Sequence, residues 1–108
     1  MLLAKKKRYE VGDVVSFKLV NGDEIVAKLE AENDNEFIIS TPLTAIPGPT
    51  GGIGLVGSMF TAESDSHAPL SKSQVMLSFK TVEMIADHYR QRTTGIETVR
   101  RDSKIILK

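Results

Sequence analysis

The chain has 108 residues, of which 41% are hydrophobic and 26% charged, and it contains no cysteine. This length fits one small domain over residues 1–108, and the composition is typical of a folded protein, not of a disordered one. The absence of cysteine excludes disulfides, thiolate metal sites and cysteine nucleophiles.

Charge is segregated along the chain although fourteen basic residues balance fourteen acidic ones. Residues 1–8, predicted to be a basic N-terminal arm, carry four basic residues and no acid. Residues 10–36 carry eight acids and two lysines, whereas residues 90–108 carry six basic residues and two acids. Net neutrality therefore leaves a nucleic-acid partner open. No apolar stretch is long enough to span a bilayer or to form a signal-peptide core, so we expect no membrane contact and a cytoplasmic location.

Three strands joined by short turns are predicted near the N-terminus. Apolar residues occupy every second position over residues 15–19 and 25–29, and residues 37–39 make a third strand. Asn21-Gly22-Asp23 supplies the first tight turn and Asn33-Asp34-Asn35 the second. This meander favours a small β-barrel over a βαβ fold.

The middle of the chain is predicted to be an insertion loop over residues 46–73, because prolines and glycines crowd its first part. Within it, residues 53–61 leave open a further strand, and the small polar residues after position 61 indicate an exposed connector.

The C-terminal third is predicted to begin with two strands, residues 74–79 and 81–85, hinged at Lys80. One or two helical turns over residues 87–92 then end at Thr93-Thr94-Gly95. Residues 93–108 are predicted to form a C-terminal arm, in which residues 104–108 are either a final strand or a segment that docks on a neighbour.

Two motifs have the sequence pattern of a cofactor-binding or catalytic site, but each is better explained as a loop. Gly52-Ile53-Gly54-Leu55-Val56-Gly57 has dinucleotide-fingerprint spacing, but prolines precede it and no helix is predicted after it. Ser64-Asp65-Ser66-His67 contains the residue types of a hydrolytic triad, but they are consecutive in a polar loop. With His88 as the only other histidine, no metal site is expected. We therefore predict no cofactor, no metal and no small-molecule substrate.

Residues 14–29 resemble the first motif of the Sm/LSm/Hfq family, which has a hydrophobic strand, Leu-x-x-Gly, and then apolar, small and apolar residues at alternate positions. In this sequence the motif positions are taken by Leu19, Gly22, Ile25, Ala27 and Leu29. Residues 75–85 resemble the paired last strands of the family, with Lys80 as the basic residue of the turn and without the usual Arg-Gly or Lys-His pair. The insertion and the tail are similar to those of the small Sm-like proteins of marine bacteriophages.

The resemblance implies an all-β fold, a small and strongly bent five-stranded Sm-like (SH3-like) barrel. This barrel would carry a long insertion between its third and fourth strands and a short C-terminal helical turn. The resemblance also implies a homo-oligomeric ring joined through edge strands. A ring agrees with the physics of a lone barrel, because closure pairs strand edges that would otherwise stay open.

In this family, RNA binds near the loops after the second and fourth strands. The resemblance therefore implies Asn33, Asp34, Asn35, Lys80 and Thr81 as RNA-binding residues, with the asparagines at base edges and Lys80 at a phosphate. Asn33 occupies the place of the family's acidic residue. The family's loop asparagine falls at Phe37, or at Asn35 if the loop is shifted by two positions.

The aromatic residues divide into two groups. Phe17, Phe37 and Phe79 fall at inward positions of predicted strands and are expected in the core. Tyr9 and Tyr89, each next to basic residues, are the candidates for stacking on bases.

Two functions remain open from the sequence. The first is a non-catalytic Sm-like ring that binds single-stranded RNA, with the basic arms adding non-specific attraction. The second is a structural or protein-interaction ring, such as a viral assembly factor, without RNA binding. An enzyme using Asp65 and His67 is disfavoured because no positioned partner group is visible.

Overall fold

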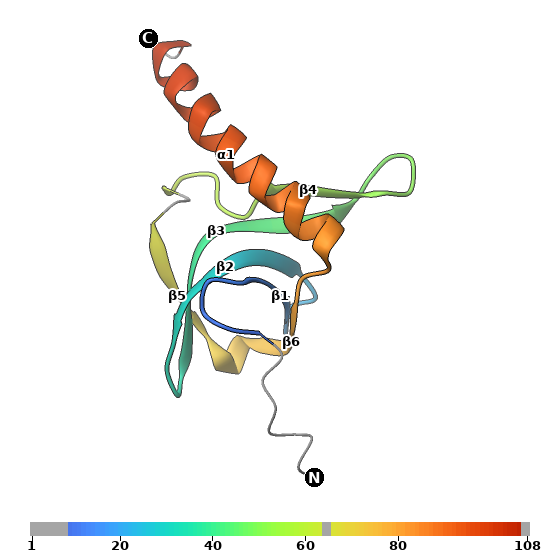
Figure 1. The fold of residues 1–108 in the computed structure, drawn as a ribbon, viewed down its shortest axis with the longest axis vertical. Helices are drawn as coiled ribbons and strands as arrows, with labels where there is room; N and C mark the ends of the chain where they lie inside the picture. Colours follow the sequence, from blue (N-terminus) through green and yellow to red (C-terminus); the bar gives the residue numbers. More distant parts are fainter. Residues whose placement is uncertain (1–8, 64–65, 107–108) are drawn as a thin grey trace.

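The fold is an antiparallel β-sheet crossed by one helix (Figure 1). The structure is a computed structural model, and it describes residues 9–63 and 66–106. The mainly-β class predicted from the sequence is confirmed. The elements in chain order are β1 (Val14–Leu19), β2 (Glu24–Glu32), β3 (Glu36–Pro47), β4 (Ile53–Gly57), β5 (His67–Ser71), the 3-10 turn η2 (Lys72–Gln74), β6 (Val75–Lys80) and α1 (Glu83–Ile106).

The sheet has the strand order β4-β3-β2-β1-β6, and β5 pairs with the first half of β3. β3 changes partner at a bend: residues 36–40 pair with β5 and residues 43–47 pair with β4. Thr41 lies at this bend with a φ of 51°, which is uncommon for a residue other than glycine, and Pro42 follows it. The sheet is therefore strongly bent. η2 connects β5 to β6, and within residues 9–63 and 66–106 no ladder pairs these two strands. The predicted closed barrel of five strands is therefore not formed by strand pairing.

The first hairpin forms as its sequence predicts. Gly22 has a φ of 98°, the left-handed conformation that glycine adopts without a steric penalty. The Asn21 Oδ1 atom accepts a hydrogen bond from the Asp23 backbone N–H at 2.9 Å, and the Gly22 N–H donates to the Leu19 carbonyl at 2.9 Å. The turn thus sets the register that places residues 14–18 opposite residues 24–28.

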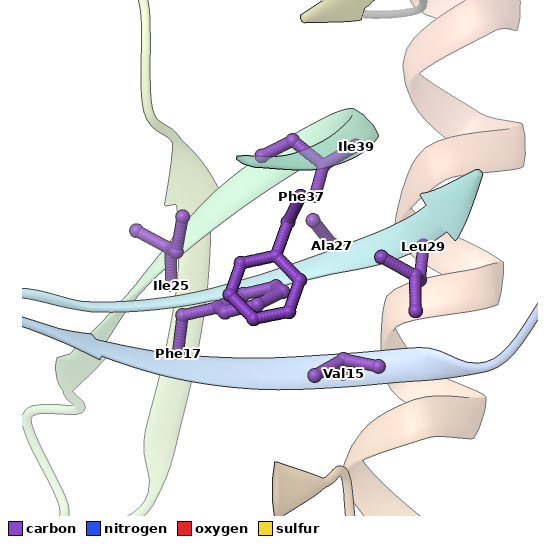
Figure 2. Packing of buried hydrophobic residues seen from close by; sticks show 7 residues of the cluster. All are labelled: Val15, Phe17, Ile25, Ala27, Leu29, Phe37 and Ile39. Atoms are coloured by element: carbon purple, nitrogen blue, oxygen red, sulfur yellow. The ribbon is translucent and has the colours of Figure 1, made fainter. Parts of the chain in front are cut away.

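The main core lies on the concave face of the sheet. Alternate residues of β1 and β2 point to this face, where the Phe17 and Phe37 rings approach to 5.0 Å between centroids. The inward positions expected for these two phenylalanines are confirmed. Figure 2 shows the seven buried members of this cluster, which are Val15, Phe17, Ile25, Ala27, Leu29, Phe37 and Ile39.

A second cluster lies between the opposite face of the sheet and α1. Ala86 and Tyr89 from the first turns of α1 pack on the sheet residues Val14, Val26, Leu43 and Leu55. Tyr89 is only 3% exposed, so the predicted role of Tyr89 as a base-stacking platform is wrong. Tyr9 is half-buried, packs against the main core and shares a 2.8 Å hydrogen bond with the Ser78 hydroxyl.

The predicted insertion loop over residues 46–73 contains two strands. β4 lies within the 53–61 stretch that was left open as a strand, and it extends β3 into a hairpin. β5, however, occupies residues predicted as an exposed connector. The sequence pattern missed it because β5 is short, and its Pro69 is a residue normally read as breaking a strand.

The predicted strand over residues 81–85 and the helix stop at Thr93-Thr94-Gly95 are both wrong. β6 ends at Lys80, and α1 runs from Glu83 through Gly95 to Ile106, so most of the predicted C-terminal arm is helical. One glycine inside a helix costs only about 1 kcal/mol relative to alanine, which long helices tolerate. The predicted N-terminal arm, Ser64, Asp65 and the last two residues lie outside the described residues.

Candidate functional site

The turn after β2 carries three of the predicted RNA-binding residues. Asn33, Asp34 and Asn35 are all exposed. The Asn33 Oδ1 atom accepts hydrogen bonds from the backbone N–H groups of Asn35 at 2.9 Å and Glu36 at 2.8 Å. The carbonyl side of the Asn33 amide thus holds the turn in shape, and among the two asparagines Asn35 is the better placed to meet a ligand.

Lys72 is the lysine that the structure brings beside this turn, and sequence reasoning did not select it. Its backbone N–H donates to the Asn35 carbonyl at 2.9 Å. Its ammonium group lies 2.6 Å from a Glu32 carboxylate oxygen and 5.1 Å from the centroid of the Phe37 ring. Lys72 reaches the turn only because β5 pairs with β3, so no local sequence signal announced this contact.

The other two predicted residues lie elsewhere in the sheet. Lys80 is opposite Val15, and its ammonium group is 3.9 Å from an Asp13 carboxylate oxygen. Thr81 is buried, and its hydroxyl shares a 2.7 Å hydrogen bond with the Ser16 hydroxyl. The structure therefore brings Lys80 and Thr81 to the start of β1, and it does not bring them into contact with the turn at residues 33–35.

The described basic side chains lie mostly beside acids. Besides the pairs of Lys72 and Lys80, the Lys28 ammonium lies 4.0 Å from Glu30, and the Arg90 guanidinium lies 2.8 Å from Asp87 and 3.3 Å from Glu83. Partnered lysines and arginines attract a polyanion less than unpaired ones do. The described part of the chain therefore has less of an electrostatic footprint for RNA than the sequence suggested.

The polar loop before β5 holds no catalytic arrangement among its described residues. The Ser66 hydroxyl donates to Glu63 at 3.3 Å, and the His67 Nε2 atom lies 3.7 Å from a Glu30 carboxylate oxygen. That same oxygen accepts a 2.6 Å hydrogen bond from Ser40, a buried residue of β3. The Ser40 hydroxyl and the His67 ring therefore both face the Glu30 carboxylate, whereas in a catalytic triad the serine hydroxyl is hydrogen-bonded to the histidine. Across residues 9–63 and 66–106, no three histidine or acidic side chains are grouped as metal ligands.

The outer edge of β5 carries backbone groups that point away from β3. Ser71 lies opposite Glu36 in the ladder between β5 and β3. The hydrogen bond from the Lys72 N–H to the Asn35 carbonyl joins the residues next to this pair, so Ser71 and Glu36 form a non-hydrogen-bonded pair. Alternate residues His67, Pro69 and Ser71 consequently direct their backbone groups away from β3.

The outer edge of β6 likewise carries backbone groups that point away from β1. The Thr81 N–H donates to the Val14 carbonyl at 3.0 Å, and Val15 lies opposite Lys80. Val15 and Lys80 are therefore a non-hydrogen-bonded pair of the ladder. Lys80 and Ser78 therefore direct their backbone groups away from β1, whereas Phe79 bonds to it. In the part of the chain that the structure describes, no strand pairs with either edge.

Large apolar side chains are exposed along β6. Met76 is 62% exposed, Leu77 is 53% exposed and Phe79 is 47% exposed. The core position expected for Phe79 is thus wrong: Phe79 lies on the outer face of β6, next to Ser16 and Lys18, because the ladder shifts register after Lys18. An edge strand with apolar side chains on its surface is a template for pairing with another chain.

Comparison of the sequence with protein-family models gives no match, and comparison with curated proteins gives none either. No helix in the described part of the chain is both long and apolar enough to cross a lipid bilayer.

Proposed function

We propose that the chain is a non-catalytic Sm-like module that assembles into a homo-oligomeric ring through the free edges of β5 and β6. The observation that carries this proposal is the pair of open strand edges, one of them lined by exposed apolar side chains. In this proposal the bent sheet is the Sm-like barrel, and β4 is an added hairpin strand outside it.

The two edges are different, and this favours a ring over a two-fold dimer. An interface between the β5 edge of one copy and the β6 edge of the next is head-to-tail, and repeated head-to-tail contacts close into a ring if the rotation allows. Closure pairs both edges of every copy, so that no edge stays available for aggregation.

Native mass spectrometry tests the assembly. One copy has a mass of 11.9 kDa, so we expect a single species at a fixed multiple of three copies or more. A species of 11.9 kDa at tens of micromolar chain, or a continuous ladder of sizes, would contradict the ring.

Binding of single-stranded RNA is the second candidate function. The favouring observation is the exposed turn at residues 33–35, whose shape is fixed by Asn33 and whose Asn35 side chain is exposed next to Lys72. In a ring this group repeats once per copy, which would compensate for the modest charge of one copy.

Filter binding with U-rich and A-rich oligonucleotides tests the RNA proposal. We expect Lys72→Ala and Lys80→Ala each to weaken binding several-fold. Each variant should also lower the slope of log affinity against log salt concentration by about 1, the contribution of one phosphate contact. Lys28→Ala is the matched control, because Lys28 is an exposed lysine outside the two predicted RNA-binding segments, residues 33–35 and 80–81. We expect this variant to leave binding unchanged. Binding that is insensitive to salt, or unchanged in both test variants, would overturn the RNA proposal and leave the assembly intact.

A further inference from the structure

An apolar cavity of about 370 Å³ opens beside the start of β5, where β3 bends. It is lined by Pro42, Met59, Ala62, Glu63, Ser66 and Ala68. Met59 is 57% exposed, and Ala62 and Ala68 are exposed as well. An exposed apolar hollow of this size suits a buried side chain of a partner.

We propose that this cavity receives the Phe79 side chain of a second copy of the chain. The inference rests on the ring proposed above and goes beyond it by naming the side chain, the cavity and the register of the contact. Two observations support it: the direction of the outward backbone groups and the face on which each side chain lies.

The free backbone groups restrict how β5 and β6 of two copies can pair. All five ladders in the sheet are antiparallel, and an antiparallel contact must join residues whose backbone groups point toward each other. On β5 these are His67, Pro69 and Ser71, and on β6 they are Ser78 and Lys80. Ala68 and Leu70 lie between these residues of β5. In every allowed register, Ala68 and Leu70 of one copy are therefore opposite residues on the outer face of β6 in the other copy.

The register with the longest overlap matches the cavity to an aromatic side chain. It sets His67 opposite Lys80, and so Ala68 opposite Phe79. Side chains directly opposite each other in an antiparallel ladder lie on the same face, with their Cβ atoms about 4.5–5.5 Å apart. Since Ala68 lines the cavity, Phe79 of the incoming copy lies over the cavity mouth.

Disulfide trapping tests the contact, because the chain has no cysteine of its own. Ala68→Cys and Phe79→Cys are prepared as separate variants, mixed, exchanged and oxidised. We expect a disulfide-linked pair containing one chain of each kind, since a non-hydrogen-bonded cross-strand pair has a Cα separation of about 4.5 Å, which a disulfide can span.

Two matched mixtures report the face and the direction of pairing. Ala68→Cys with Ser78→Cys places the thiols on opposite faces and should give at least ten-fold less linked product. Pro69→Cys with Phe79→Cys tests a parallel contact, which would keep the outer faces of both copies together. More linked product from this mixture than from the 68/79 mixture would overturn the inference.

The energetic contribution of Phe79 is measured separately. We expect Phe79→Ala to weaken association at least ten-fold, whereas Val20→Ala, a truncation of another exposed apolar residue at the β1–β2 turn, should change it less than two-fold. If the unmodified chain is an oligomer but neither the 68/79 linkage nor the Phe79 effect is found, the inference fails and the ring stands. If the unmodified chain has the mass of one copy, both fail.

Discussion

Replacing Ser78 by proline is expected to convert the proposed oligomer into single copies that keep their fold. The Ser78 N–H points away from β1, so proline removes no hydrogen bond from the sheet of one copy. In the proposed interface, however, that N–H is a donor at the centre of the β6 edge, and the proline ring also occupies the space of the incoming strand. Native mass spectrometry should show mainly the 11.9 kDa species, with at least a hundred-fold loss of association.

Ser78→Ala is the matched control for this variant. Both substitutions remove the 2.8 Å hydrogen bond between the Ser78 and Tyr9 hydroxyls, but alanine keeps the backbone donor. We expect Ser78→Ala to remain an oligomer with a slightly lower melting temperature. Lys80→Pro removes the neighbouring edge donor and should also dissociate the oligomer. Folded Ser78→Pro and Lys80→Pro that retain the unmodified mass would show that the β6 edge is not an interface.

Tyr89→Phe is expected to lower the free energy of unfolding by about 2–3 kcal/mol at neutral pH. The Tyr89 hydroxyl accepts a hydrogen bond from the Lys28 N–H at 3.1 Å and shares its own proton between the Thr41 carbonyl at 2.8 Å and the Ser40 carbonyl at 3.1 Å. Phenylalanine fills the same space but leaves these backbone groups, one on β2 and two at the bend of β3, without that partner. Chemical denaturation followed by circular dichroism measures the change, and a difference below 0.5 kcal/mol would contradict the role given to the hydroxyl.

The same hydroxyl predicts how stability changes at alkaline pH. Burial raises the pKa of Tyr89 from 10.0 to about 12, although hydrogen bonding from the Lys28 backbone N–H and from the Thr41 side chain opposes the rise. Below pH 10 both folded and unfolded chains hold the proton, so Tyr89 gives no pH dependence there. Between pH 10 and 12 the unfolded chain loses the proton first, so the stabilisation of the folded chain falls as the pH rises. We expect the stability difference between the unmodified chain and Tyr89→Phe to shrink over this interval and to be constant from pH 6 to 9.

The first half of the fold was predictable because its signals are local. Alternation of apolar residues in β1 and β2 determines the buried face, and Asn21-Gly22-Asp23 determines the turn between them. A one-residue slip would turn Phe17 to solvent, so the pattern allows one register only.

The second half was predicted less well because tertiary contacts decide it. β5 is a strand because it pairs with β3, and Pro69 is tolerated there since its missing N–H would point away from the ladder. The start of α1 has its own signal, which the interpretation as a strand overlooked: Ile85, Ala86 and Tyr89 recur at helical spacing and pack on the sheet.

The candidate site was predictable only where it is contiguous in sequence. The turn at residues 33–35 is exposed as expected, but Lys72 joins it across a ladder between segments far apart in the chain. The free edges also follow from the ladder spacing, which cannot be obtained before the strand pairing is known. The exposure of Phe79 depends on the register shift after Lys18, an irregularity that residue types do not reveal.

Hydrogen exchange at the strand edges tests the central claim most directly. In one copy the N–H groups of Ser78 and Lys80 face outward, whereas those of Leu77 and Phe79 bond to β1. The ring predicts that, in the native oligomer, the Ser78 and Lys80 amides exchange as slowly as their two neighbours, because the β5 edge of the next copy accepts their hydrogen bonds. Fast exchange at both outward amides, with slow exchange at Leu77 and Phe79, would contradict assembly through these edges.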